Sequence, residues 1–232
     1  MPKFIADFFP NVANYWDIFL IALTATYQMF FIAGLITLLI GGAFGISLIV
    51  TKTDGIKPNR IIHFILEVIT NVFRAVPFII LLIFLIPLTR SIAGTSIGVK
   101  GAVVPLVFGA VPFYTRQVET ALADVNPGKI EAARSMGSSI LGIIFRVYLH
   151  EALPDLIRVT TITAISLIGL TTSAGAVGAG GIGSFAINYG QNLHYQDVVN
   201  LCVILLLIIV SLIQLLGNTL SKATTNKELF HK

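Results

Sequence analysis

The sequence has little charge. Only 11% of its 232 residues are Asp, Glu, Lys or Arg, whereas 56% are hydrophobic, and soluble domains carry about 25% charged residues. The apolar runs are long and continuous, which excludes a transmembrane β-barrel, because barrel strands alternate in polarity and are about 10 residues long. The scarcity of charge therefore predicts an all-α integral membrane protein.

Other absences narrow the function. The single cysteine, Cys202, excludes an intrachain disulfide, and no G-K-[ST] sequence is present, so no P-loop is predicted. The four histidines lack the spacing of metal ligands, and no nucleophile lies in a catalytic pattern, so we expect neither a metal site nor an enzyme. The net charge of +4 is spread over loops, which argues against nucleic-acid binding. Residues 1–17 lack the pattern of a cleaved signal, so the first span is expected to stay.

Five transmembrane helices are predicted from apolar runs of about 20 residues or more. An N-terminal external segment, 1–17, precedes them, and a basic cytoplasmic tail, 222–232, follows them. The predicted spans cover about 18–50, 61–88, 101–123, 157–177 and 198–221. Glycines in the first span are expected to let neighbouring helices approach closely.

Charge predicts the orientation of these spans. The loop 51–60, the region 126–158 and the tail hold ten of the 15 Lys and Arg residues, whereas Lys3, Arg90 and Lys100 are on the opposite side. The positive-inside rule then places the N-terminus outside and the C-terminus in the cytoplasm.

A few polar side chains interrupt the spans. Arg116 and Glu119 are three residues apart and can form an ion pair. Arg74 and Pro77 resemble the Arg-x-x-Pro of amino-acid importers, a resemblance by which Arg74 could face a substrate carboxylate. We favour its pairing with a carboxylate such as Glu67 or Glu119, or its reaching the cytoplasmic headgroups. The hydroxyl-bearing residues Ser166, Thr171 and Thr172 could line a pathway, or could only satisfy backbone groups of their own helix.

A glycine run follows the fourth span. Gly178 to Gly183 matches G-x-G-x-x-G, but it follows an apolar span rather than a strand and has no acidic residue at the ~20-residue offset, so a nucleotide site is rejected. An irregular turn at the outer end of the span is predicted instead. Gly178, Gly180 and Gly181 would belong to an outer gate or a contact for an external protein, or to a plain connector.

The segment 126–154 is the longest soluble-looking part of the chain. Asn126 can cap a helix that begins with Pro127, Gly137 offers a turn, and Pro154 stops or kinks the second helix. The pattern predicts a helix–turn–helix. It is either a docking element for a soluble partner or an interfacial helix on the lipid surface.

This segment resembles the cytoplasmic coupling segment of ABC importer permeases. The resemblance rests on Glu131-Ala132-Ala133, on Gly137, and on Val147 and Leu149. The family expects Pro after this Leu, but His150 stands here, and Leu153-Pro154 follows four residues later. By the resemblance, Ala132 and Ala133 allow close approach of an ATPase, and Glu131 offers it a charge.

Three segments in order, 71–87, 126–154 and 174–190, resemble the permease subunit of methionine-type ABC importers. The resemblance implies the transmembrane fold of a type I ABC importer in the bacterial cytoplasmic membrane. It also implies a second copy of the chain, a cytoplasmic P-loop ATPase dimer that holds ATP and Mg, and an external substrate-binding lipoprotein. It implies methionine uptake. An ABC permease for another solute, a secondary transporter without an ATPase and a structural scaffold are the alternatives.

Overall fold

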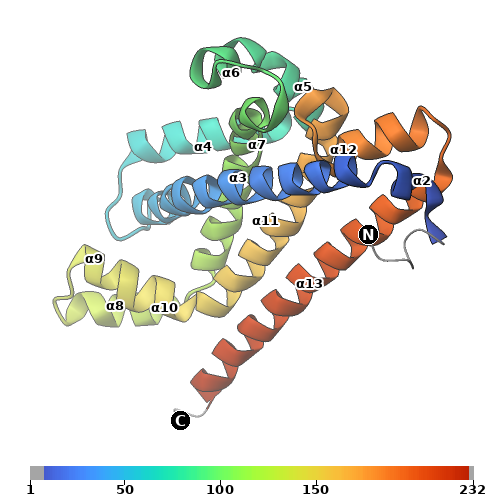
Figure 1. Cartoon of the computed structure of the whole chain (residues 1–232). Helices are drawn as coiled ribbons and strands as arrows, with labels where there is room; N and C mark the ends of the chain where they lie inside the picture. The colour runs from blue at the N-terminus through green and yellow to red at the C-terminus, as the bar shows by residue number, and fades with distance from the viewer. Residues whose placement is uncertain (1–7, 230–232) are drawn as a thin grey trace. The chain divides into compact units, whose positions relative to one another are not determined.

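The structure is a computed structural model that describes residues 8–229. All regular elements in this part of the chain are helices (Figure 1), which confirms the predicted all-α class. The charges counted at Lys3 and Lys232 lie outside the described residues. The chain divides into two compact units. One comprises Met1–Leu35, Val76–Gly109 and Ala164–Ile213, and the other comprises Ile36–Ala75, Ala110–Thr163 and Gln214–Lys232.

The first unit is built around apolar contacts of the N-terminal helices. Its elements include α2 (Pro10–Asn14), the beginning of α3 (Trp16–Thr51), α5 (Phe78–Phe84), α6 (Ile86–Ala93), the beginning of α7 (Gly98–Ala123), the second half of α11 (Leu153–Ala174), η2 (Gly175–Ala179), α12 (Gly181–Phe185), η3 (Ala186–Gln191) and the beginning of α13 (Gln196–Leu229). Val12, Phe19, Phe185 and Val198 are buried together. The backbone N–H and side-chain amide of Asn11 both donate to the Asp197 carboxylate at 2.9 Å, which ties α2 to α13.

The second unit holds the remaining parts of these long helices and the polar segment. Its elements include the end of α3, α4 (Arg60–Ala75), the end of α7, α8 (Pro127–Ser135), α9 (Ile140–Ile143), η1 (Ile144–Tyr148), α10 (Leu149–Glu151), the beginning of α11 and the end of α13. Its apolar cluster joins the ends of α3 and α7 to α8–α10.

Within the described part of the chain, four helical stretches are long and apolar enough to cross a membrane: Trp16–Thr51, Gly98–Ala123, Leu153–Ala179 and Gln196–Thr225. The predicted spans 18–50, 101–123, 157–177 and 198–221 each lie inside one of them. Arg60–Ala75 and Phe78–Phe84, which are bent by 106° at the break between them, make a fifth candidate when the pair is counted as one span.

The predicted span 61–88 is not one continuous helix. α4 ends at Ala75, α5 begins at Phe78, and α6 follows from Ile86. Pro77 interrupts the helix because proline has no N–H to donate and disfavours helical geometry at the residue before it. The prediction of one continuous span over 61–88 is therefore wrong, and α4 and two short helices take its place.

Glycines bring α3 against α7, as predicted. A Cβ atom on Gly45 would lie 2.6 Å from Cβ of Val118 and 2.8 Å from the carbonyl oxygen of Thr115. A Cβ atom on Gly41 would lie 3.0 Å from Cδ1 of Tyr114. These two glycines therefore set how closely the two helices pack.

Gly45→Ala should destabilise the protein, because the added methyl group would overlap Val118 and the backbone of α7. We expect a loss of about 1–3 kcal/mol in the free energy of unfolding, measured by thermal or denaturant unfolding in detergent. Gly42→Ala is the matched control on the same helix, since its Cβ would meet only Tyr114 Cε1 at 3.9 Å. Equal stability of the two variants would contradict the packing argument.

Candidate functional site

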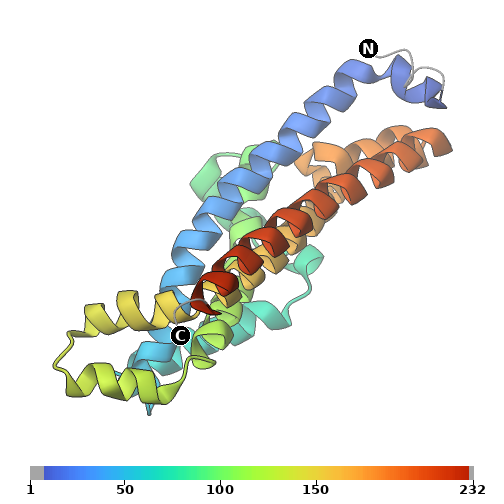
Figure 2. The ribbon, with the colours of Figure 1, turned by 90° about the horizontal axis from the view of Figure 1, so that it is seen from below.

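The segment 126–154 forms a helical hairpin. α8 lies beside the second arm, residues 140–151, in both views (Figures 1 and 2), and the two arms are in contact. The second arm consists of three consecutive elements: α9, the π-helical turn η1, and α10. The predicted helix–turn–helix is therefore present, and we call residues 126–152 the hairpin.

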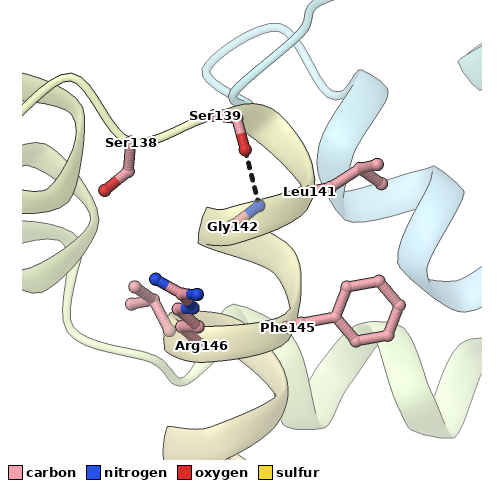
Figure 3. Close-up of a pocket in the computed structure, with 7 residues that line it drawn as sticks. Ser138, Ser139, Leu141, Gly142, Phe145 and Arg146 are labelled. Atoms are coloured by element: carbon pink, nitrogen blue, oxygen red, sulfur yellow. Dashed lines mark hydrogen bonds between the residues drawn. The ribbon is translucent and has the colours of Figure 1, made fainter.

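Local hydrogen bonds define the ends of both arms. The Asn126 side chain accepts from the backbone N–H of Gly128 at 2.8 Å, which confirms the predicted cap. Gly137 has φ of +76°, a backbone conformation that glycine adopts without steric cost. The Ser139 hydroxyl then accepts from the backbone N–H of Gly142 at 3.1 Å and caps the second arm (Figure 3).

The inner face of the hairpin is apolar and buried. Ala133, Ile143, Tyr148 and Ala152 share one cluster with side chains from the end of α3, the loop 51–59 and the end of α7, namely Ile49, Ile56, Tyr114, Val118, Leu122 and Val125. Val147 and Leu149 pack against this cluster. Ala133 is only 5% exposed, so it packs the hairpin against α3 and α7. The resemblance led us to expect that both Ala132 and Ala133 face a partner, and Ala133 does not fit that expectation.

The outer face carries large apolar side chains in the open. Met136 is 77% exposed, Leu141 66% and Phe145 64%. Leu141 and Phe145 line a hollow of about 380 Å³ together with Arg146 and the turn before α9 (Figure 3). The sequence analysis did not identify Met136, Leu141 and Phe145 as an exposed apolar surface. The four-residue spacing of Leu141 and Phe145, which places them on one helix face, could have indicated it.

Charges surround both faces. Lys129 donates to the Glu151 carboxylate and so links α8 to α10. No ion pair joins Glu131 to Arg134 in residues 8–229, and both side chains are exposed. Burial raises the pKa of the Tyr148 phenol, and the Asp54 carboxylate raises it further while Arg134 lowers it. Tyr148 therefore lies within electrostatic reach of the loop 51–59 and of α8.

The end of the hairpin joins α11 and α13. α11 begins at Leu153, and Pro154 occupies its second position after a turn at Ala152. The Ser221 hydroxyl of α13 donates to the carbonyl oxygen of Pro154 at 3.2 Å. Leu153 is 40% exposed, so only the first of these two predicted residues is accessible.

The glycine run forms the irregular turn that was predicted. Gly178, Gly180 and Gly181 have φ of +91°, +79° and +79°. A Cβ atom on Gly181 would lie 2.7 Å from the Thr26 hydroxyl oxygen. That hydroxyl accepts from the backbone N–H of Ile182 at 2.9 Å. The turn is thus packed closely against α3.

The polar residues of the fourth span satisfy their own helix. The hydroxyls of Thr171 and Thr172 donate to the carbonyl oxygen of Ile168 at 2.7 and 3.0 Å. Ser166 is half-buried. Among residues 8–229, no group of three or more His, Cys, Asp or Glu side chains could hold a metal ion.

The charged residues inside the spans are arranged differently from the expectation. Arg116 pairs with Glu119 at 2.6 Å, as predicted. The expected pairing of Arg74 with Glu67 or Glu119 is wrong. Glu67 lies 3.8 Å from His63, and Glu119 is bonded to Arg116. Arg74 is exposed and has no ion pair in the part of the chain that the structure describes.

Long apolar helices with an attached polar hairpin define a helical membrane protein. The family model described as "Binding-protein-dependent transport system inner membrane component" matches residues 43–226. The chain belongs to this family.

Known relatives are similar over most of the chain. The probable D-methionine transport system permease protein MetI of Vibrio cholerae is 39% identical over 208 residues, which cover 88% of this chain and 92% of that protein. The methionine import system permease protein MetP of Bacillus subtilis is 41% identical over 174 residues, which cover 75% of this chain and 78% of that protein.

Solved structures show the same fold. An inward-facing structure of the MetNI methionine ABC transporter matches with a TM-score of 0.88 and 41% identity over 91% of this chain and 98% of that chain. An amino acid ABC transporter, at 16% identity, 93% and 98% coverage and a TM-score of 0.77, supports the fold alone. The fold is that of the transmembrane domain of a type I ABC importer.

Gly137→Ala should loosen the hairpin. No atom lies within 4 Å of the added Cβ, so the cost arises only from the left-handed backbone, about 1–2 kcal/mol. We expect faster limited proteolysis between 135 and 140 in the purified protein. Gly137→Asn is the control, because Asn tolerates this conformation better. Cleavage of the Ala and Asn variants at the wild-type rate would show that the turn does not depend on glycine.

Proposed function

We propose that this chain is the permease subunit of an ATP-driven importer. It forms the pathway for methionine and close analogues across the cytoplasmic membrane by alternating access. The observation that carries this proposal is the 39–41% identity to methionine permeases, together with the exposed hairpin.

The proposed assembly has two copies of this chain, a cytoplasmic P-loop ATPase dimer and an external substrate-binding lipoprotein. Five spans are few to enclose a pathway, and two copies around a two-fold axis supply ten. ATP and Mg belong to the ATPase in this proposal. The charge bias of the loops supports a cytoplasmic C-terminus and hairpin.

The outer face of the hairpin is the proposed docking surface for the ATPase. Met136, Leu141 and Phe145 supply the apolar anchors that a helix lying in a groove requires, and Glu131 and Arg146 supply charges beside them. The inner face packs on α3 and α7. Movement of the ATPase would therefore shift the spans rather than the hairpin alone.

The turn at Gly178, Gly180 and Gly181 is the proposed outer gate or contact for the external binding protein. Its positive φ angles and close packing on Thr26 support a defined shape. A defined shape favours this role over that of a plain connector.

Phe145→Ala should weaken docking of the ATPase. An exposed aromatic anchor that becomes buried in a complex is typically worth about 2 kcal/mol or more, so we expect at least about a 30-fold loss of affinity. Co-purification and titration with the ATPase measure it. Phe31→Ala is the matched control, since Phe31 is 65% exposed but lies on α3. If both variants bind the ATPase like the unsubstituted chain, this docking surface is wrong.

Reconstitution tests the substrate. Proteoliposomes containing this chain, its ATPase and its binding protein should accumulate labelled methionine only with ATP. Excess unlabelled methionine should compete, and other amino acids should not. A complex that hydrolyses ATP in response to its binding protein but moves no methionine would assign the permease to another solute.

A further inference from the structure

We infer that Asn71 and Arg74 of α4 form a transient site for the carboxylate group of the transported amino acid. This inference rests on the proposed function and deepens it. Four observations carry the inference: the two faces of α4, the direction of its polar face, the local balance of charge, and the position of Arg74 along the helix.

α4 has one polar stripe and one apolar face. Its polar residues recur every three or four positions and therefore lie on one side of the helix: Arg60, His63, Glu67, Thr70, Asn71 and Arg74. Ile61, Ile65 and Val72 on the other side are 73%, 49% and 55% exposed. This apolar face suits contact with lipid.

The polar stripe is turned toward the protein. His63 Nδ1 lies 3.1 Å from the carbonyl oxygen of Leu48 on α3. Thr70 is 1% exposed. Arg116 Nη2 on α7 donates to Asn71 Oδ1 at 2.8 Å. Because a guanidinium only donates, the oxygen of the Asn71 amide must face Arg116, and its NH₂ group is left to donate elsewhere.

The charges near Asn71 leave one cation in excess. Arg116 is neutralised by Glu119 at 2.6 Å. Arg74 lies one helical turn beyond Asn71, is exposed, and has no carboxylate within 4.0 Å among residues 8–225. The guanidinium of Arg74 and the free NH₂ of Asn71 thus offer donors side by side to an anion.

Arg74 lies next to the last residue of α4, the first helix of the candidate fifth span, which bends by 106° at the break before α5. Arg74 follows Arg60 by 14 residues, which is about 21 Å along an α-helix, and the hydrocarbon core is about 30 Å thick. A charge within a membrane span faces protein or water, because lipid solvates it poorly. A carboxylate has two acceptor oxygens that match a guanidinium. Every amino-acid substrate carries this group.

The experiment uses the sequence's single cysteine. In a Cys202→Ser background, Arg74→Cys is assembled with the ATPase and binding protein in proteoliposomes, and initial methionine uptake is compared at equal amounts of complex. Loss of a charge-assisted hydrogen bond predicts about a tenfold or greater fall in uptake. A cationic methanethiosulfonate reagent should restore uptake several-fold by returning a fixed positive charge. An anionic reagent of similar size should not.

Val72→Cys is the matched control, since Val72 lies on the apolar face of the same helix. It should transport normally and react with neither reagent. Asn71→Cys keeps Arg74, so methionine, but not methioninamide, which lacks the carboxylate, should slow its modification. If the partner of Arg74 is instead a lipid phosphate or a carboxylate of a second copy, methionine and methioninamide will have the same effect on the modification rate.

The inference is overturned if Arg74→Cys transports at the rate of the background protein. It is also overturned if the cysteine is unreactive because lipid or a second copy covers it, or if both reagents have the same effect on uptake. Failure of the unsubstituted protein to take up methionine would instead overturn the proposed function. The two failures are therefore separate.

Discussion

The apolar contact beneath the hairpin is the interaction on which the proposed mechanism depends. Tyr148 and Ala133 are buried against Ile49 and Leu122, and burying a large apolar side chain contributes about 1.5–3 kcal/mol. The loop 51–59 reinforces the contact, since Ile56 joins the same cluster. Because the inner face is fully used in this way, only the outer face is left for a soluble partner. A force that a partner exerts on the outer face would therefore be transmitted to α3 and α7.

The membrane imposes the second constraint. Polar groups in hydrocarbon must find partners within the protein, and most threonine hydroxyls of the spans donate to a carbonyl one turn earlier on their own helix, as Thr161 and Thr163 do at 2.8 Å. The buried hydroxyls of Thr37, Thr89 and Thr115 are the exceptions among the described residues. Glycine at 41 and 45 allows α3 and α7 to approach closely. An exposed, unpaired arginine on α4 requires a separate explanation.

The sequence predicted best what depends on local chemistry. The cap at Asn126 and the turn at Gly137 follow from side-chain acceptors and a left-handed backbone, and both were found. The break at Pro77 was missed although proline signalled it, because hydropathy alone favoured a continuous run. The division of the hairpin into two faces was also missed. Periodicity shows that two faces exist, but only tertiary packing shows that Ala133 faces inward and Met136 outward.

The error over Arg74 shows why long-range pairing resists sequence analysis. Its spacing from Glu67 placed both on one helix face. In the structure Glu67 instead lies beside His63 on that same face, and Glu119 pairs with Arg116 on α7. The cation left over fits a group that all amino acids share. A site of this kind would carry methionine without recognising its thioether, so discrimination between amino acids would fall mainly to the external binding protein. The permease would then need only a polar contact that is weak enough to release what it has bound.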